Sequence, residues 1–595
     1  MTKEHLLVNP ELPPPAASKN TRKDIVKASW ARKFKITAFC ALGGLLFNYW
    51  PKPAHVGIGG NPSYLIKARN GAVATENILC SEIGVDVLKA GGNAVDAAIA
   101  ATFCIGTVAM YSSGIGGGGL MTIRIPPVSA GEPSEVFTID FRETAPALAN
   151  TTMFPPYSNS SRYGGLSVGV PGEIRGLEEA HRRWGTLPWK TLVEPSIALA
   201  KGWTIQVELG QRITWFPELM LGNPDWSAVF APRGRFLREG EVIRRTNYSR
   251  TLATIASEGP DAFYKGPIAD SLIKKIRATG GVLSHADFEN YRVEVKHALQ
   301  GTYRGRKVYT TDAPTSGPAL LHMLNLIEKF PMTTRTPLNV HRAIEVLKFG
   351  FAARTKICDP AFNNDTKRID EIPTKSFADA VAVNITDDRT HSAQYYNPEY
   401  DVKTDHGTSH TSVIDKNGMA VALTSTVNLI FGSQVLDPET GVLLNDEMDD
   451  FSTPGTPNGF GLWPSPYNYP EPGKRPLSSM VPTIVEHEDG SLTVVGGSGG
   501  GRIFGAIFQT LLNLDWGLDA REAVEYWRVH TQLLPEIVDV DEGYPAHILA
   551  GLLERGHRLS VTPLVAAVVQ LIVRRPDGQI FAASDSRKNG IAAGW

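Results

Sequence analysis

A predicted β-hairpin, about two-thirds of the way along the chain, constrains the fold more than any other stretch. The letters SHTSVID, KNG and MAVALTSTVN (residues 409–428) indicate a strand, a turn and a second strand. Asp415 suits the first position of a type I turn, and Gly418 supplies the left-handed residue of a three-residue hairpin loop. This loop predicts that Asp415 pairs with Met419.

The predicted register places Thr408 directly opposite Thr426, and Asn428 points to the same face because side chains alternate along a strand. Cβ atoms of such cross-strand pairs lie roughly 4.5–5.5 Å apart.

Thr408 follows Gly407 in DHGTSH (residues 405–410), and a hydroxyl residue after a glycine, at the head of a strand, suits the nucleophile of a self-cleaving chain. Cleavage would free an α-amine with a reference pKa of about 7.7–8.0, which can act as base for the same residue's hydroxyl. The alternative is that Thr408 has no catalytic role and forms an ordinary cross-strand pair with Thr426.

Size and composition exclude several classes of protein. The chain has 595 residues, enough for a large core, with 42% apolar and 20% charged residues. Its net charge of -2 gives no reason to expect a nucleic-acid partner. The four cysteines fit no common zinc motif and are too few for a disulfide scaffold. We expect no metal and no cofactor.

The N-terminal region predicts a membrane anchor. Residues 1–33 are polar and basic, as in a disordered cytosolic tail, and residues 34–50 are largely apolar. The apolar segment is short for a span, which needs about 17–25 residues. It ends in bulky residues rather than the small ones of a cleavage site, so an uncleaved signal-anchor is favoured over a cleaved signal peptide. Basic residues are denser before the segment, which places the folded body in a lumen (such as a vacuole) or outside the cell.

Two further features agree with a secretory location. Five Asn-x-Ser/Thr triplets are candidate glycosylation sites: Asn150, Asn159, Asn247, Asn364 and Asn384. Residues 80–89 indicate a short helix, and Asn93 can cap a second. Cys80 stands at the beginning of the first helix and Cys104 at the end of the second, a geometry that suits a disulfide. Two buried free thiols are the alternative.

Two glycine motifs suggest rival functions, and both have the wrong context. Gly114-x-Gly116-x-x-Gly119 matches a dinucleotide fingerprint but runs into a β-rich segment instead of opening a helix, so lining of a pocket or close packing fits better. Residues 165–169 match the G-x-S-x-G elbow of serine α/β-hydrolases, with Ser167 as nucleophile. Its helix is expected only near Glu173, whereas the elbow needs a helix beginning at the serine.

Four other segments carry candidate binding groups. Arg142 follows an apolar strand, where it suits a bidentate carboxylate clamp or a surface ion pair. The segment NDEMDD brings Glu447, Asp449 and Asp450 together, either to hold a cation or as a solvated loop. Ser478 and Ser479 precede a strand, and the glycines of GGSGGG (residues 496–501) stand between a strand and an apolar run, where their amides can form an oxyanion hole.

Taken together, these motifs resemble the γ-glutamyltransferase (glutathione hydrolase) family. The matching letters are CSEIG, GGNAVDAAIAATFC, GIGGGG, DFRETAP, GTSHTSVID, TSTVN, NDEMDDFS, KRPLSSM and GGSGGGRI. They stand in the family's order and spacing, over roughly residues 65–595. The resemblance implies an α+β fold, a four-layer αββα sandwich of the N-terminal-nucleophile hydrolase type. It also implies autocatalytic cleavage at Gly407–Thr408 into a large subunit (51–407) and a small subunit (408–595), which form a heterodimer.

The resemblance also implies roles for individual residues. Thr408 is implied as the nucleophile and Thr426 as its support. The groups implied around the substrate α-carboxylate are Arg142, Ser478 and Ser479, and those around its α-amine are Asn428, Glu447 and Asp450. Gly499 and Gly500 are implied as oxyanion amides. A disulfide in animal members strengthens the Cys80–Cys104 pairing, and residues 457–474 lie where the family has a lid-like loop.

The activity implied is attack on the γ-carbonyl of glutathione or a related γ-glutamyl compound, with release of the acyl group to water or to an amino acid or dipeptide. An unprocessed, inactive relative that serves as a binding protein is the alternative of a different class. The presence of every expected site residue argues against it.

Overall fold

The structure is a computed structural model that describes residues 55–129, 131–155, 158–401, 407–455, 457–458, 461–565 and 567–595. The chain divides into two units, Met1–Pro53 and Ala54–Trp595, and the fold below is that of the second. The predicted tail (1–33) and anchor (34–50), together with Asp405 and His406, lie outside the described residues. Within the described ranges, no helix combines the length and apolar character needed to cross a membrane.

Two seven-stranded antiparallel sheets form the centre of this unit. The first has the order β21 (Ala593–Gly594), β4 (Gly71–Ala74), β12 (Ser409–Asp415), β13 (Ala420–Thr426), β5 (Gly118–Ile125), β6 (Glu135–Phe141) and β9 (Glu294–His297). The second has the order β10 (Leu299–Tyr303), β11 (Arg306–Thr310), β14 (Thr483–Glu486), β15 (Leu492–Ser498), β19 (Val568–Arg574), β20 (Ile580–Ser584) and β3 (Ile66–Ala68).

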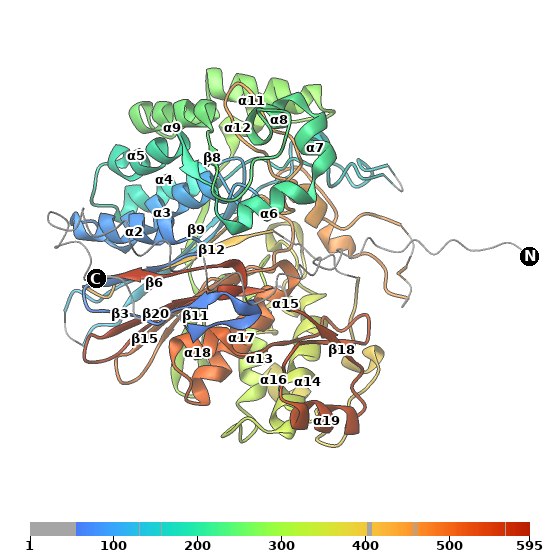
Figure 1. Ribbon diagram of the computed structural model, residues 1–595. Coiled ribbons are helices and arrows are strands. Elements are labelled where there is room, and N and C mark those ends of the chain that lie inside the picture. Colours follow the sequence, from blue (N-terminus) through green and yellow to red (C-terminus); the bar gives the residue numbers. More distant parts are fainter. Residues whose placement is uncertain are drawn as a thin grey trace, which may run out of the picture. The chain divides into compact units, whose positions relative to one another are not determined.

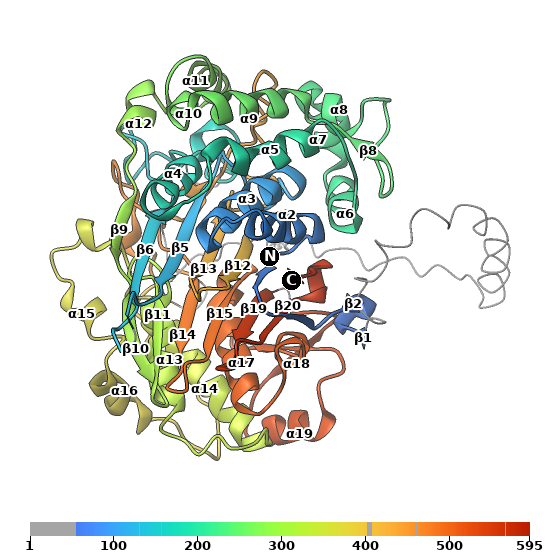
Figure 2. The same ribbon diagram turned by 90° about the vertical axis from the view of Figure 1, so that its left-hand side faces the viewer.

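Helices cover the outer face of each sheet, so the expected four-layer αββα arrangement is confirmed (Figures 1 and 2). The first sheet is covered by α2 (Ile78–Lys89), α3 (Ala94–Val108) and α4 (Glu173–Trp184), with α5 (Trp189–Ala200), α9 (Thr246–Glu258), α10 (Asp261–Tyr264), α11 (Pro267–Ala278) and α12 (His285–Asn290) outside them. The second is covered by α13 (Gly317–Ile327), α17 (Ile503–Asp515) and α18 (Ala520–Glu525), and α14 (Pro337–Arg354), α16 (Lys375–Ala382) and α19 (Ala546–Glu554) pack outside them. The other helices are α6 (Val207–Trp215), α7 (Pro217–Gly222), α8 (Pro224–Phe230) and α15 (Lys367–Asp370).

Small strands complete the unit: β1 (His55–Val56) with β2 (Pro62–Ser63), β7 (Trp203–Thr204) with β8 (Val242–Ile243), and β16 (Val529–His530) with β17 (Val538–Asp541) and β18 (Leu559–Thr562). The contact between the two large sheets is packed by small and branched side chains. Ala72, Ala420 and Ala422 belong to one apolar cluster with Ile484 and Val494. The small residues let the sheets approach closely around the central hairpin.

The predicted hairpin register is confirmed. Ser409 pairs with Ser425 and Ile414 with Ala420. The Asp415 amide donates to the Met419 carbonyl at 3.0 Å, and Gly418 has φ of 83°. The side-chain carboxylate of Asp415 also accepts from the amides of residues 417 and 419 at 2.8 and 3.1 Å, which fixes the turn. Thr408 therefore stands one residue before β12, at the position opposite Thr426.

The Cys80–Cys104 disulfide is present, with a Cα–Cα distance of 5.3 Å. The helices extend beyond the predicted limits, because α2 begins at Ile78 and α3 runs on to Val108. Cys80 therefore lies in the first turn of α2, and Cys104 lies one turn before the end of α3. Asn93 caps α3 as expected, accepting from Val95 and Asp96 amides.

We expect loss of this disulfide to lower stability without touching the chemistry. The bond closes a sequence separation of 24 residues, and a loop of that size corresponds to about 3–4 kcal/mol of unfolding free energy in the chain-entropy model. Cys80→Ala/Cys104→Ala should therefore unfold at lower denaturant concentration while retaining its kcat at 25 °C. Denaturant titration of both proteins checks this, and an unchanged midpoint would contradict it.

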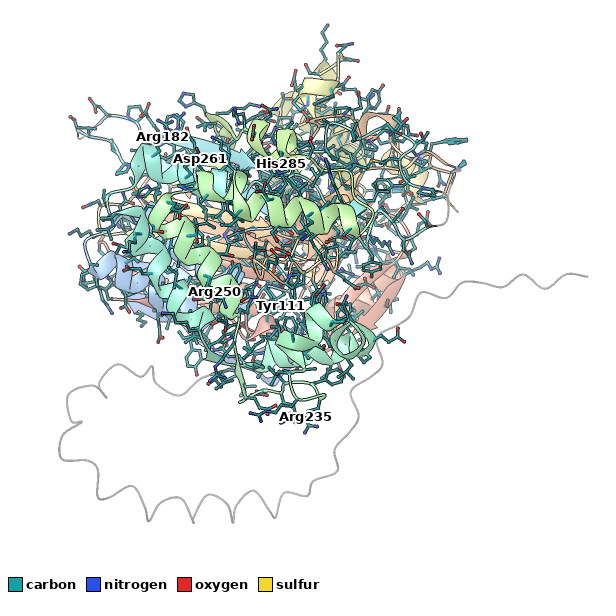
Figure 3. The ribbon with its side chains drawn as sticks, turned by 90° about the horizontal axis from the view of Figure 1, so that it is seen from above. Tyr111, Arg182, Arg235, Arg250, Asp261 and His285 are labelled. Carbon is teal, nitrogen blue, oxygen red and sulfur yellow. A yellow bond between two sulfur atoms is a disulfide. The ribbon has the colours of Figure 1, made fainter. Side chains whose placement is uncertain are left out.

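The outer helices carry scattered charges of both signs (Figure 3). Arg182 on α4 pairs with Glu179 at 2.7 Å, and His285 on α12 lies 2.7 Å from Asp270. Asp261 on α10 pairs with Arg175 at 2.6 Å. Such exposed pairs contribute little to stability, so the stability of this layer comes from the apolar faces that its helices bury.

Candidate active site

The Gly407–Thr408 bond lies buried at the head of β12. Thr408 is 1% exposed, and its hydroxyl contacts the carbonyl oxygen of Gly407. The Thr426 hydroxyl donates to that same carbonyl oxygen at 2.8 Å. It also accepts from the Asn428 amide at 2.8 Å, which leaves its proton for Gly407. The family resemblance implied that Thr426 supports Thr408, and in this structure the Thr426 hydroxyl holds the carbonyl of the Gly407–Thr408 bond.

A β-carbon on Gly407 would collide with the backbone oxygen of Asn428. Only glycine allows the two segments to approach so closely. Asn428 itself has φ of 71°, a left-handed conformation that asparagine tolerates. Its side-chain nitrogen donates to the Asp446 carbonyl at 3.2 Å, while no donor among the described residues reaches its buried Oδ1. This oxygen is an acceptor available to a bound cationic group.

The carboxylates of NDEMDD are buried, so the solvated-loop alternative is wrong. Glu447 is 1% exposed and Asp450 7%. Asn445 fixes the segment, because its Oδ1 accepts from the Glu447 amide at 3.0 Å and its Nδ2 donates to the Gly116 carbonyl at 2.8 Å. The Asp449 carboxylate instead accepts a hydrogen bond from the Ser161 hydroxyl at 2.5 Å.

Arg142 lies between these carboxylates and the serine segment. Its guanidinium contacts Glu447 and pairs with Asp450 at 2.5 Å. Its Nε and Nη2 also donate to the carbonyls of Pro476 and Leu477, each at 3.2 Å. The family resemblance implied that Arg142 binds the α-carboxylate of a substrate and that the two acids bind its α-amine. In this structure Arg142 and the acids pair with each other directly.

Burial perturbs several carboxyl groups at the site. It raises the pKa of Asp446 well above its usual range, although the Leu429 amide donates to that side chain at 2.8 Å. Burial also raises the pKa of Glu143, next to Arg142, to about 8. The same cause raises the pKa of Glu173 to about 8, against the lowering effect of its hydrogen bond from Ser425. A low-dielectric surrounding strengthens every charge interaction made there.

The serines and the glycine loop occupy the second sheet's side of the site. Ser478 and Ser479 are both fully buried. Gly499 and Gly500 follow β15, with φ of 125° and 62°, in the region that favours glycine. The chain then passes through residues 500–502 into α17. The predicted order of strand, glycine loop and helix is confirmed.

A lysine and a glutamate that sequence reasoning missed join these parts. Lys588 donates from Nζ to the Thr408 carbonyl at 3.2 Å and to the Ser498 hydroxyl at 2.9 Å. It also pairs with Glu76 at 3.2 Å. Lys588 is 180 residues from Thr408, so no local pattern revealed it. This link brings the glycine loop beside Thr408.

The two glycine motifs that suggested rival functions have structural roles instead. A β-carbon on Gly116 or Gly117 would collide with the backbone oxygen of Leu443 or Thr426. The glycine-rich segment thus serves close packing, one of the predicted alternatives. Ser167 is fully buried and donates to the Gly164 carbonyl at 2.8 Å, and α4 begins only at Glu173. No nucleophile elbow forms there.

The loop predicted to act as a lid meets the segment that precedes the cut. Within residues 457–474, the carbonyl of Trp463 accepts from the Asp401 amide at 2.8 Å. Asp401 also forms an isolated parallel β-bridge with Pro464. Trp463 is 56% exposed, whereas Asn468 is buried. The Asn468 side chain donates to the Asp450 carbonyl at 2.8 Å and accepts from the Leu477 amide at 3.1 Å, so it ties the loop to the site.

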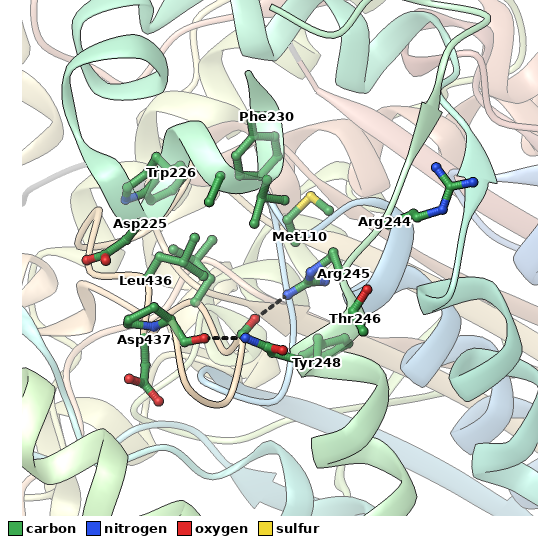
Figure 4. A pocket seen from close by; sticks show the side chains of 16 residues that line it. Met110, Asp225, Trp226, Phe230, Arg244, Arg245, Thr246, Tyr248, Leu436 and Asp437 are labelled. Carbon is green, nitrogen blue, oxygen red and sulfur yellow. Dashed lines mark hydrogen bonds between the residues drawn. The ribbon is translucent and has the colours of Figure 1, made fainter. Parts of the chain in front are cut away.

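Two other features lie apart from the predicted residues. A cavity of about 250 Å³ is lined by Trp226, Phe230 and Tyr248 among others, and none of the candidate catalytic or substrate-binding residues lines it (Figure 4). His341, Glu345 and His557 form a buried cluster whose ligand atoms lie within 4.8 Å of one another.

The histidine cluster is a hydrogen-bonded network rather than an open metal site. His341 Nδ1 lies 2.8 Å from His557 Nε2. The Thr390 and Tyr396 hydroxyls donate to the Glu345 carboxylate at 2.7 and 2.6 Å. The Lys348 ammonium lies 3.4 Å from the same carboxylate and already supplies a positive charge.

A chain with a buried threonine at the head of a central strand, between two antiparallel sheets covered by helices, has the architecture of an N-terminal-nucleophile hydrolase. A solved structure similar to it is the cephalosporin acylase from Bacillus halodurans, with a TM-score of 0.78 and 25% identity, covering 92% of this chain and 98% of that one.

The γ-glutamyltranspeptidase family model matches residues 80–595. The chain is 45% identical to glutathione hydrolase proenzyme 1 of Schizosaccharomyces pombe, over 90% of this chain and 86% of the relative. It is 32% identical to the glutathione hydrolase proenzyme of Escherichia coli, over 96% of this chain and all of the relative. This chain belongs to the γ-glutamyltranspeptidase family.

Proposed function

We propose that this protein is a self-processing γ-glutamyltransferase and glutathione hydrolase with Thr408 as its nucleophile. The observation that carries the proposal is the contact of the Thr408 hydroxyl with the Gly407 carbonyl, together with the Thr426 hydrogen bond to that carbonyl. A carbonyl held by a donor is polarised for attack. The names of the similar proenzymes support glutathione as the substrate.

Processing begins when Thr408 Oγ bonds to the carbonyl carbon of Gly407. The Gly407 C–N bond breaks, and the hydroxyl proton passes to the nitrogen that becomes the α-amine of Thr408. Water then hydrolyses the ester and leaves a Gly407 carboxylate and a free Thr408. The products are the chain up to Gly407, which contains the large subunit (51–407), and the small subunit (408–595). They stay together because their strands share both sheets.

In the processed enzyme, Thr408 Oγ attacks the γ-carbonyl of the donor and its own α-amine takes the proton. Amides of Gly499 and Gly500 stabilise the oxyanion. The leaving amine receives the proton, and a γ-glutamyl ester of Thr408 remains. Water releases glutamate, or the amine of an amino acid or dipeptide accepts the γ-glutamyl group, with the α-amine again as base.

The γ-glutamyl head is a zwitterion and needs both signs of charge. Arg142, Ser478 and Ser479 take its α-carboxylate. Its α-ammonium binds the oxygens of Asn428, Glu447 and Asp450. In support of this, the Arg142 guanidinium and the two acids pair with one another. A zwitterionic head can exchange with these ion pairs without leaving a buried charge unbalanced.

Arg142→Lys should raise KM for γ-glutamyl donors by about 10- to 100-fold, because a point charge cannot replace a guanidinium fork that holds two carbonyls and a ligand. Steady-state kinetics with γ-glutamyl anilide measures the effect. Arg162→Lys is the matched control, since Arg162 is exposed and pairs with Asp449 at 3.4 Å. An unchanged KM in Arg142→Lys would contradict the clamp role.

Two other functions make different predictions. If the protein were a serine hydrolase, Ser167→Ala would abolish activity while processing continued. The Ser167 hydroxyl is buried and bonded to the Gly164 carbonyl, which argues against a role as nucleophile. An inactive binding protein would stay a single chain and turn over no donor. Denaturing gels and an anilide assay on the same sample separate the three functions.

We also propose that the body faces a lumen or the cell exterior, behind an N-terminal signal-anchor. The disulfide supports an oxidising compartment. The triplets at Asn150, Asn159, Asn364 and Asn384 are exposed, whereas Asn247 is half-buried and donates to the Pro438 carbonyl at 2.6 Å. Glycosidase treatment should therefore shift the large subunit only. A body without glycans or disulfide would contradict this location.

A further inference from the structure

Arg354, the last residue of α14, lies against the two serines from the side of the second helical layer. It is 3% exposed. Its Nη2 donates to the Ser479 hydroxyl at 2.8 Å, and its Nε donates to the Ser316 hydroxyl at 2.9 Å. Ser316 in turn donates to the Ser478 carbonyl at 2.8 Å. One guanidinium therefore fixes both serines, one directly and one through Ser316.

These bonds determine where the serine protons can point. A hydroxyl has one proton and two acceptor lone pairs. The Ser479 oxygen accepts from Arg354, and the Ser478 oxygen accepts from the Met480 amide at 3.1 Å. Each hydroxyl has an acceptor position filled by the protein and its proton left to donate. A hydroxyl that accepts from a cationic donor is also polarised into a stronger donor.

The same short segment is held from its other end by the first sheet. Arg142 donates to the carbonyls of Pro476 and Leu477, both at 3.2 Å. The Ser478 amide donates to the Pro314 carbonyl at 2.8 Å. Residues 476–479 are thus clamped between two buried arginines, one from each half of the fold. Such a clamp presents serine hydroxyls in a fixed geometry, and a bound anion requires that geometry.

We propose that Arg354 is a positioning residue for the α-carboxylate of the γ-glutamyl donor, acting through Ser479 directly and through Ser316 on Ser478. The inference rests on the proposed function. Its consequence is selective: removal of Arg354 weakens binding of donors that carry an α-carboxylate and spares donors that lack one. A residue needed only for folding would affect both kinds of donor equally.

The test compares γ-glutamyl anilide with 4-aminobutyryl anilide, which lacks only the α-carboxylate. Wild type should prefer the first donor. In processed Arg354→Gln, we expect KM for γ-glutamyl anilide to rise about 10-fold or more, since a charge-assisted hydrogen bond is lost, while kcat/KM for 4-aminobutyryl anilide stays within about 2-fold. Equal losses for both donors, or an unchanged KM, would overturn the proposal. A wild type that hydrolyses neither donor would instead refute the proposed function.

The control is Arg342→Gln on the same helix, where the guanidinium binds Asp387 at 2.8 and 2.6 Å; it should leave the donor preference unchanged. A double-mutant cycle tests the route of action. If Arg354 acts through Ser479, the rise in KM caused by Arg354→Gln should be smaller in the Ser479→Ala background than in wild type, and what remains reflects the route through Ser316. Fully additive effects would contradict the Ser479 route.

If Arg354→Gln fails to process, Ser316→Ala replaces it in the comparison. This variant keeps the arginine and its bond to Ser479 but loses the donor to the Ser478 carbonyl. It should raise KM for γ-glutamyl anilide about 3- to 10-fold and leave 4-aminobutyryl anilide unaffected. An equal loss for both donors would again overturn the proposal.

Discussion

Thr408→Ala should leave the protein as one uncut chain and lower γ-glutamyl hydrolysis by at least about 10⁴-fold, as loss of a catalytic nucleophile does. The reason is that a single oxygen serves two reactions. Thr408 Oγ already contacts the Gly407 carbonyl in the intact chain, and after cleavage the same atom attacks the donor. Denaturing gels and an anilide assay measure the two consequences together.

Thr408→Ser is the matched control, since it keeps an oxygen nucleophile and removes one methyl group. It should process and retain measurable turnover. A Thr408→Ala protein that still appears as two fragments would show that another residue or an external protease makes the cut. One that stays whole but turns over donor at the wild-type rate would remove Thr408 from catalysis altogether.

Thr426→Val should slow self-cleavage by about 100- to 1,000-fold, the usual effect of removing one donor to a developing oxyanion. Valine matches threonine in shape, so it removes the hydrogen bond to the Gly407 carbonyl oxygen, 2.8 Å long, together with the bond that the Thr426 hydroxyl accepts from the Asn428 amide. Pulse-chase measurement of the uncut precursor gives the rate directly.

Thr426→Ser should restore processing, because it returns the hydroxyl while losing the methyl group. The order of rates we expect is wild type, then serine, then valine. If valine processes as fast as wild type, the hydrogen bond to the scissile carbonyl has no catalytic role, and Thr426 would only pack beside Thr408.

The hairpin and its register were predictable from sequence because the information is local. Asp415 and Gly418 define a turn, and a turn defines every pair beyond it. The disulfide was predictable for a similar reason, since the helices bearing Cys80 and Cys104 are consecutive. Limits of helices are less well determined locally: α2 begins two residues earlier than predicted and α3 runs four residues further.

Contacts between distant segments were not predictable from local patterns. Lys588, Glu76 and Arg354 reach the site from the ends of the chain and from α14, and no spacing rule links them to Thr408. The resemblance to a family supplied Arg142 and the acids as separate groups, but not their direct pairing. The buried state of NDEMDD likewise depends on Asn445, whose partners lie far away in sequence.

Intact-mass analysis and N-terminal sequencing of the purified wild-type protein test the role of Thr408 most directly. We predict two polypeptides held in one particle, the smaller one beginning Thr408-Ser409-His410 and spanning residues 408–595. The same sample should hydrolyse γ-glutamyl anilide. A single uncut chain that hydrolyses this donor at the full rate would contradict the central claim that Thr408 acts as an N-terminal nucleophile.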